Sequence, residues 1–387
     1  MPKNILEVIN MKWNLILLAY LSLFALSLID NGRAPTYYSI LSDLEIGPAK
    51  GSYIFTIASF ISLIVCLTAP KWLPRIGPVK GTRLSLLFLA ASGICLYFTG
   101  RFLSYPLLLV SSALLGLGIA ICSLTMNILI MKGSTSELRR KVFSGLHAIY
   151  GFSSLLAPFV LAGILKIGGD WKIYFLAVST LPVLVLLMTS KTDNLLEKEE
   201  QGKALEKGVP LKVRILFGVL FGCYVGSELV ISSRLPYYLN THLKLDEVTS
   251  GYYLSLFFLF LTMGRIIFSL KHFNIKSEIL LLVSFITTLI SFTLGHQVHP
   301  FFLSLMGLFM SYAFPTALDY LVQVFDLKSD YMLTSVMTWI GVVLGFVHFF
   351  FGMINESYGA NIALLISPFL SLCSLSALMI FLKMKKV

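Results

Sequence analysis

Two apolar stretches of the chain each place an acidic residue shortly before an arginine. Asp30 precedes Arg33 in the first half, Glu228 precedes Arg234 in the second, and each arginine begins the same spacing, Arg-x-Pro-x-Tyr. A carboxyl group held away from water can gain and lose a proton near neutral pH. Two guanidinium groups that face each other can clamp a carboxylate or a phosphate. These residues could therefore carry protons, bind an anion, or do both.

The sequence around these residues is typical of membrane helices. The chain has 387 residues, of which 57% are hydrophobic and 13% charged, about half the charged share of a soluble domain. Apolar segments of about 20 residues, long enough to span a bilayer, recur along the whole chain. We predict an all-α polytopic membrane protein with twelve transmembrane helices in two pseudo-symmetric six-helix bundles. The predicted bundles are residues 1–190 and 213–387, joined by a cytoplasmic linker at 191–212.

The distribution of charge predicts the orientation of the chain. A net charge of +11 would suit a nucleic-acid partner, but most of the 30 Lys and Arg residues fall on one predicted side of the membrane. By the positive-inside rule both termini and the linker are cytoplasmic, in a cell inner (plasma) membrane, and no nucleic acid is expected. The short polar start runs directly into an apolar span, which favours a first membrane helix over a cleaved signal peptide. The five cysteines lack CxxC spacing, so we expect no metal and no cofactor.

Glu228 is the leading candidate for a proton carrier, and Asp30 is the second. At 1.5 Å per residue Glu228 lies about 22 Å along a helix that starts near Val213, past the centre of the span. Ionisable groups inside a membrane helix are costly and face the interior of the helix bundle. The alternative for Glu228 is a permanent hydrogen bond to a neighbouring helix.

Arg33 and Arg234 have two interpretations. Arg33 could form an internal ion pair with Asp30, since residues three apart are neighbours on a helix, and it lies near the outer interface, where arginine can snorkel. Alternatively, Arg33 and Arg234 face each other across a central cavity and clamp an anionic substrate.

Further candidates are polar or aromatic residues within predicted spans. Those considered for substrate binding, besides the two arginines, are Asn31, Tyr37, Tyr238, Asn127, His147 and Tyr150, and those considered for gating are Arg75, Asp319 and Arg265. Each has a structural alternative. Tyrosine is enriched at membrane interfaces, and a lone histidine or asparagine often bonds a neighbouring helix.

Several of these motifs resemble the major facilitator superfamily. The loop Pro74-Arg75-Ile-Gly77 resembles the superfamily's G-x-x-x-D-R-x-G-R-K motif, with Pro74 at the aspartate position, so the usual salt bridge of that loop is in doubt. The motifs Tyr224-Val-Gly-Ser-Glu228, Gly264-Arg265, Phe314-Pro315-Thr316 and Leu146-His147 are similar to the fucose:proton symporter family. The resemblance implies two six-helix halves with a substrate site between them, near the bilayer midplane. On the fourth helix Ser123 stands at the acid position of the fucose symporter, so fucose itself is not indicated.

The expected function is secondary active transport of a small polar solute by alternating access, coupled to protons through Glu228 or Asp30. The family resemblance favours a sugar-like solute, whereas the arginines favour an organic anion. We expect a monomer in the lipid bilayer and no enzymatic activity, because the metalloprotease, serine-hydrolase and nucleotide-binding motifs are absent. The alternative is a receptor or lipid-handling protein of the same fold that does not transport.

Overall fold

The computed structural model describes residues 11–135, 138–189, 209–270, 275–325 and 328–385. Most of the predicted linker lies outside these ranges, as do a few side chains within helices, including that of His147. Within the described residues the secondary structure is helical, and twelve spans are long and apolar enough to cross a membrane. The predicted all-α fold with twelve membrane helices is therefore confirmed.

The chain divides into two compact units. One unit contains Met1–Glu45 and Ile57–Glu200, and the other contains Ile46–Thr56 and Gln201–Val387. The first holds α2 (Trp13–Asp43), most of α3 (Pro48–Ile76), α4 (Pro78–Phe102), α5 (Tyr105–Gly133), α6 (Arg139–Lys166) and α7 (Trp171–Met188). The second holds the start of α3, α8 (Leu211–Thr241), α9 (Glu247–Leu270), α10 (Ser277–Gln297), α11 (Phe301–Met310), α12 (Ala313–Phe325), α13 (Ser329–Leu364) and α14 (Ile366–Lys385).

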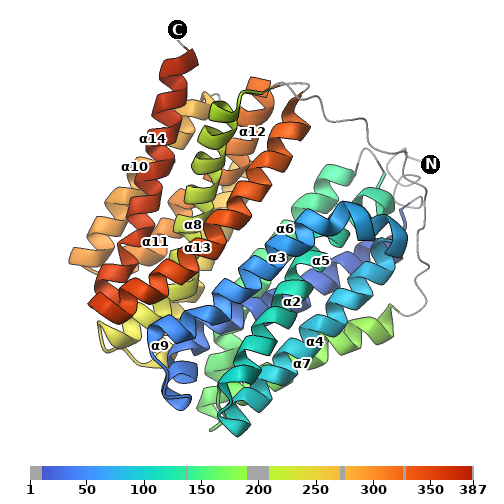
Figure 1. Cartoon of the computed structure of the whole chain (residues 1–387), viewed down its shortest axis with the longest axis vertical. Coiled ribbons are helices and arrows are strands. Elements are labelled where there is room, and N and C mark those ends of the chain that lie inside the picture. The colour runs from blue at the N-terminus through green and yellow to red at the C-terminus, as the bar shows by residue number, and fades with distance from the viewer. Residues whose placement is uncertain (1–10, 136–137, 190–208, 271–274, 326–327, 386–387) are drawn as a thin grey trace. The chain divides into compact units, whose positions relative to one another are not determined.

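The helices α2 and α8, which carry the repeated Arg-x-Pro-x-Tyr segments, are central in their units. In the first unit α2 packs against α4, α5, α6 and α7, and in the second α8 packs against α9, α11, α12, α13 and α14 (Figure 1). Their apolar windows are 67% and 61% buried, the largest shares among the twelve spans. A helix that is apolar on all sides is suited to such a position.

Glycines let α8 approach α13 closely. A Cβ atom added at Gly218 would overlap the ring of Trp339, and one added at Gly222 would lie 2.8 Å from a methyl group of Val343. Small residues permit this backbone approach in lipid, where helix association depends on close packing. The four-residue spacing of these glycines therefore marks the contact between α8 and α13.

The span at 301–325 differs from the single helix that the sequence predicts, because two helices, α11 and α12, meet at Ser311 and Tyr312. The physical reason for this interruption is Pro315, four residues after Ser311. Pro315 has no backbone N–H to donate to the Ser311 carbonyl, and its ring would clash with that carbonyl in a continuous helix. The Ser311 hydroxyl donates instead to the carbonyl of Leu308, at 2.7 Å, within the last turn of α11.

Candidate functional site

Two of the charged candidates of the second unit, Glu228 and Arg265, lie together. Nη2 of Arg265, on α9, lies 3.6 Å from Oε1 of Glu228, on α8. The side chains are 33% and 19% exposed, respectively, so the pair is neither sealed in the core nor open to free solvent. The sequence singled out both residues but for separate roles, Glu228 in proton coupling and Arg265 in gating. Their contact makes them one ion pair.

Tyr224 completes this cluster, one helical turn before Glu228. Its buried hydroxyl lies 2.7 Å from Oε2 of Glu228 and 2.6 Å from the backbone carbonyl oxygen of Met310. Met310 is the last residue of α11, so the hydroxyl reaches the point where that span is broken. Sequence reasoning gave Tyr224 no role, although its four-residue spacing from Glu228 places both side chains on one face of α8.

The broken span also contacts α9 beside Arg265. A Cβ atom at Gly264 would overlap the Ser311 hydroxyl and would lie 3.1 Å from the Leu308 carbonyl oxygen, so only glycine lets α9 lie this close. Interrupted helices release backbone polar groups that transporters use to bind substrates and ions. We refer to Tyr224, Glu228, Arg265 and the Met310–Ala313 break as the α8–α9 cluster.

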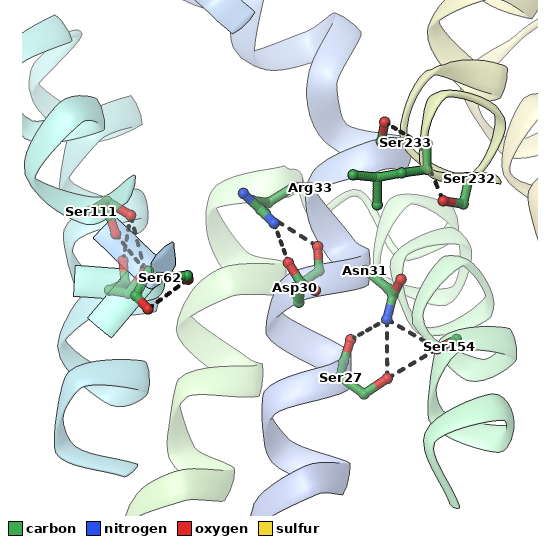
Figure 2. A network of polar contacts seen from close by, with 12 residues as sticks. Ser27, Asp30, Asn31, Arg33, Ser62, Ser111, Ser154, Ser232 and Ser233 are labelled. Atoms are coloured by element: carbon green, nitrogen blue, oxygen red, sulfur yellow. Dashed lines mark hydrogen bonds and ion pairs between the residues drawn. The ribbon is translucent and has the colours of Figure 1, made fainter. Parts of the chain in front are cut away.

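In the first unit Asp30 and Arg33 form the internal ion pair. Nη2 of Arg33 donates to Oδ1 of Asp30, and Nε donates to the Asp30 carbonyl oxygen at 3.3 Å (Figure 2). The guanidinium is nearly buried, and the carboxylate is 20% exposed. This geometry matches the structural interpretation of the pair. The alternative, an arginine clamp with Arg234, stays a prediction.

Asn31 connects α2 to α6 through hydroxyl groups. Its Nδ2 lies 3.0 Å from each of the Ser27 carbonyl oxygen, the Ser27 hydroxyl and the Ser154 hydroxyl (Figure 2). The two serine hydroxyls lie 3.1 Å apart. Tyr150 contributes its backbone carbonyl, which accepts from Ser154 at 2.8 Å. The amide group therefore belongs to a polar helix contact, and a role in substrate binding stays a prediction.

Arg234 is fully buried, with 0% exposure. Its guanidinium carbon lies 4.1 Å from the ring centroid of Phe55 and 4.8 Å from that of Phe351. Nη2 lies 3.3 Å from the Ser52 hydroxyl. The arginine thus contacts aromatic rings at the start of α3 and on α13, within the second unit.

The two tyrosines of the repeated segments are also buried. Tyr37 is completely inaccessible to solvent, and Tyr238 stacks on His242 with ring centroids 5.3 Å apart. Asn127 is exposed, but its Nδ2 donates to the Ser123 carbonyl of its own helix at 2.8 Å. Substrate binding by these three residues stays a prediction.

The remaining gating candidates lie at helix ends or on an exposed helix surface. Arg75 is exposed in the last turn of α3. Asp319, on α12, accepts hydrogen bonds from Ser277 of α10 at 2.9 Å and from Gln323 at 2.6 Å. Neither contact tests a gating role. In the described part of the chain, no three His, Cys, Asp or Glu side chains are grouped so that they could hold a metal ion.

Comparison with known proteins identifies relatives of the whole fold. The profile of the Major Facilitator Superfamily matches residues 15–331. The multidrug efflux pump SdrM of Staphylococcus aureus (strain N315) is 25% identical over 244 residues, which cover 61% of this chain and 50% of that pump. The match thus spans half the length of this curated relative.

Two solved transporters show how far the architecture is shared. The xylose transporter XylE from E. coli, in an inward-open conformation, superposes with a TM-score of 0.76 at 12% identity over 95% of each chain. The transporter FucP, in an outward conformation, superposes with a TM-score of 0.63 at 13% identity, covering 94% of this chain and 98% of that one. At such low identity these likenesses concern the fold alone.

Proposed function

The chain belongs to the major facilitator superfamily, and on that basis we propose that it is a proton-coupled secondary transporter of a small polar solute. Its fold is that of a multi-pass membrane transporter. The proposal adds alternating access in a cell inner membrane, a cytoplasmic location for both termini, and a monomeric protein. A transporter of this fold needs no enzymatic step, and an ion gradient supplies the energy.

The observation that carries the proposal is the α8–α9 cluster. Glu228 is a half-buried acid within a span, and it has both a cationic partner, Arg265, and a hydroxyl partner, Tyr224. Protonation of Glu228 removes the charge that attracts Arg265, so each proton that binds weakens the contact between α8 and α9. A proton carrier needs such a coupling between protonation and helix packing.

The proposed substrate is a neutral, sugar-like solute rather than an organic anion. Arg33 already neutralises Asp30, and Arg234 is enclosed by Phe55 and Phe351, so an anion would have to displace existing contacts to use them. The named substrate of one structural relative, xylose, agrees with this choice. Asp30, Asn31 and Tyr150 are the proposed polar contacts from the first unit.

The test begins with purified protein and a thermal-shift screen against sugars, nucleosides, carboxylates and phosphates. Compounds that raise the melting temperature are then used in liposomes, in uptake driven by a proton gradient and in exchange without a gradient. We expect the Glu228→Gln variant to lose gradient-driven uptake and to retain exchange. Glu356→Gln is the matched control, because Glu356 accepts a hydrogen bond from the backbone N–H of Ala49 at 2.7 Å and is not proposed to carry protons.

Two results would overturn parts of this proposal. Unchanged gradient-driven uptake by Glu228→Gln would remove this acid from the coupling mechanism. Binding without exchange of any compound would instead favour the second candidate, a receptor or lipid-handling protein of the same fold. A screen that also contains lipophilic drugs separates solute uptake from the drug export for which the SdrM relative is named.

A further inference from the structure

The Tyr224 hydroxyl is shared between two oxygen atoms. The Oε2 atom of Glu228 lies 2.7 Å from it, and the carbonyl oxygen of Met310 lies 2.6 Å from it. In a continuous helix the N–H of Phe314 would donate to the carbonyl of Met310. The tyrosine hydroxyl is therefore inserted into the backbone ladder of the broken span, a recognised cause of a sharp helix distortion.

The number of hydrogen atoms available for these two contacts depends on whether Glu228 is protonated. A phenolic hydroxyl has one hydrogen to donate, and both a carboxylate and a carbonyl oxygen can only accept. If Glu228 is ionised, Tyr224 can donate fully to Glu228 or to Met310, and the other oxygen loses its partner. If Glu228 is protonated, its carboxyl O–H donates to Tyr224, and Tyr224 donates to Met310. Only the protonated form satisfies both short contacts at once.

We propose that Tyr224 is a positioning residue that transmits the protonation state of Glu228 to the break between α11 and α12. In the protonated state the hydroxyl holds the Met310 carbonyl at the end of α11. On loss of the proton, the hydroxyl turns to the carboxylate, where a charge-assisted hydrogen bond is stronger than a neutral one. The Met310 carbonyl is then released, and a buried carbonyl without a partner is costly, so the break changes its conformation.

Arg265 competes with Tyr224 for the carboxylate of Glu228. Its Nη2 lies 3.6 Å from Oε1 of Glu228, within the range of an ion pair but beyond hydrogen-bond distance. An ionised Glu228 would attract the guanidinium from α9 more closely. On the other faces of α8, the described contacts near this level are between uncharged hydroxyls, those of Ser227 with Ser367 and Ser371 of α14. Arg265 and Tyr224 are the ionisable groups that the described contacts place against Glu228.

This inference rests on the proposed function, because it links the protonation of the proposed proton carrier to a conformational change at the break between α11 and α12. The experiment measures this conformational change in the absence of any substrate. Hydrogen–deuterium exchange of the backbone at 308–316 is followed between pH 5 and pH 9 in lipid nanodiscs, and infrared difference spectra follow the carboxyl band of Glu228 over the same range. Glu228→Gln identifies that band and also mimics the protonated acid, since its amide can donate to Tyr224.

In the wild type we expect protection at 308–316 to fall as the Glu228 band disappears, by about threefold to tenfold relative to Glu228→Gln, the effect of one hydrogen bond. Glu228→Gln should stay protected at every pH. Tyr224→Phe should stay unprotected at every pH, although its Glu228 band still titrates. Tyr174→Phe is the matched control and should behave as the wild type. Tyr174 is a buried tyrosine that donates to the Leu28 carbonyl, also at 2.6 Å, and it has no carboxyl partner among the described residues.

Each outcome bears on a different statement. Protection that depends on pH in Tyr224→Phe as it does in the wild type would overturn the role of Tyr224. A pH-dependent Glu228→Gln would show that another group drives the change, and would also overturn it. If protection at 308–316 changes with pH as expected but uptake does not depend on the proton gradient, the inference is supported and the proposed proton coupling is refuted.

Discussion

The guanidinium carbon of Arg234 lies 4.1 Å from the centroid of the Phe55 ring. The centroid of the Phe351 ring lies 4.8 Å from the same carbon, and Phe55 also stacks on His348, with ring centroids 5.0 Å apart. A cation held over aromatic faces gains electrostatic attraction, and the planar guanidinium gains stacking as well. Arg234 thereby connects α8 to the first turns of α3 and to α13.

This stacking predicts that lysine cannot replace Arg234. Arg234→Lys keeps the charge but loses the planar contact with Phe55 and Phe351, a loss of about 1–2 kcal/mol in a desolvated site. We expect a lower melting temperature in detergent for Arg234→Lys, and a similar decrease for Phe55→Leu. A variant that melts as the wild type does but fails to take up an anion would favour the substrate clamp.

The Asp30–Arg33 pair predicts that replacing both residues destabilises the protein less than replacing either one alone. Arg33→Gln removes the guanidinium beside the Asp30 carboxylate, and Asp30→Asn removes that carboxylate from the largely buried Arg33 guanidinium. Breaking one half of a buried pair costs about 3–5 kcal/mol, while replacing both partners is often close to neutral. Thermal unfolding of the two single variants and the double variant measures this directly. Additive losses in the double variant would contradict a structural ion pair.

Removal of the cation beside Glu228 should change the pH dependence of transport. Without its guanidinium, the ionised form of Glu228 loses a favourable charge and the protonated form is favoured. We therefore expect the pH profile of exchange by Arg265→Gln to move to higher pH, whereas Arg265→Lys should move it less. The measurement is the initial rate of exchange in liposomes buffered equally on both sides. A profile unchanged in both variants would mean that Arg265 does not influence the carrier.

The sequence was sufficient for the spans because a run of apolar residues is a local property. Charges inside such a run are equally visible, so Glu228, Arg265, Asp30 and Arg33 were found one by one. The pairing of Asp30 with Arg33 was also predictable, since residues three apart lie on the same face of a helix. Glu228 lies six residues before Arg234, too far for such a pair. The acid of the first repeat therefore pairs within its own helix, whereas the acid of the second pairs with Arg265 of another helix.

Pairings between helices were not predictable, because they depend on how each helix is rotated about its axis. Glu228 meets Arg265 and Arg234 meets Phe55 only because α8, α9 and α3 present those faces to one another. The break at Ser311 escaped prediction for a related reason. Pro315 permits either a bend or a full interruption, and the Tyr224 hydroxyl that contacts the Met310 carbonyl at the break belongs to a distant part of the sequence.

The break itself leads to a further prediction. Pro315→Ala restores the N–H that can donate to the Ser311 carbonyl and removes the clash of the ring. We expect α11 and α12 to become more continuous, the melting temperature to rise by roughly 2–4 °C per kcal/mol gained, and exchange to become slower. Pro182→Ala, in α7 of the other unit, is the control for proline removal. Faster exchange by Pro315→Ala would contradict a functional role for the break.

The acidic cap of α7 predicts a loss of stability in acid. Asp170 precedes the helix, and its carboxylate accepts from the backbone N–H of Ile173 at 3.1 Å and pairs with Nζ of Lys172 at 2.9 Å. Partial burial acts to raise the pKa of Asp170, but the hydrogen bonds from Lys172 and Ile173 outweigh it and hold the pKa below its ordinary value. An acid with a depressed pKa in the folded state stabilises the fold above its unfolded-state pKa of about 3.9.

That contribution is lost as the pH falls through the folded-state pKa, because both states then carry the proton. Asp170→Asn is the informative variant, since asparagine caps a helix as well as aspartate does but cannot pair with Lys172. We expect the wild type to melt higher than Asp170→Asn at pH 6, and the difference to shrink progressively as the pH is lowered below about 4. Melting temperatures measured by tryptophan fluorescence in the same detergent provide the comparison. A difference that stays constant down to the lowest pH would mean that Asp170 acts through packing rather than through its charge.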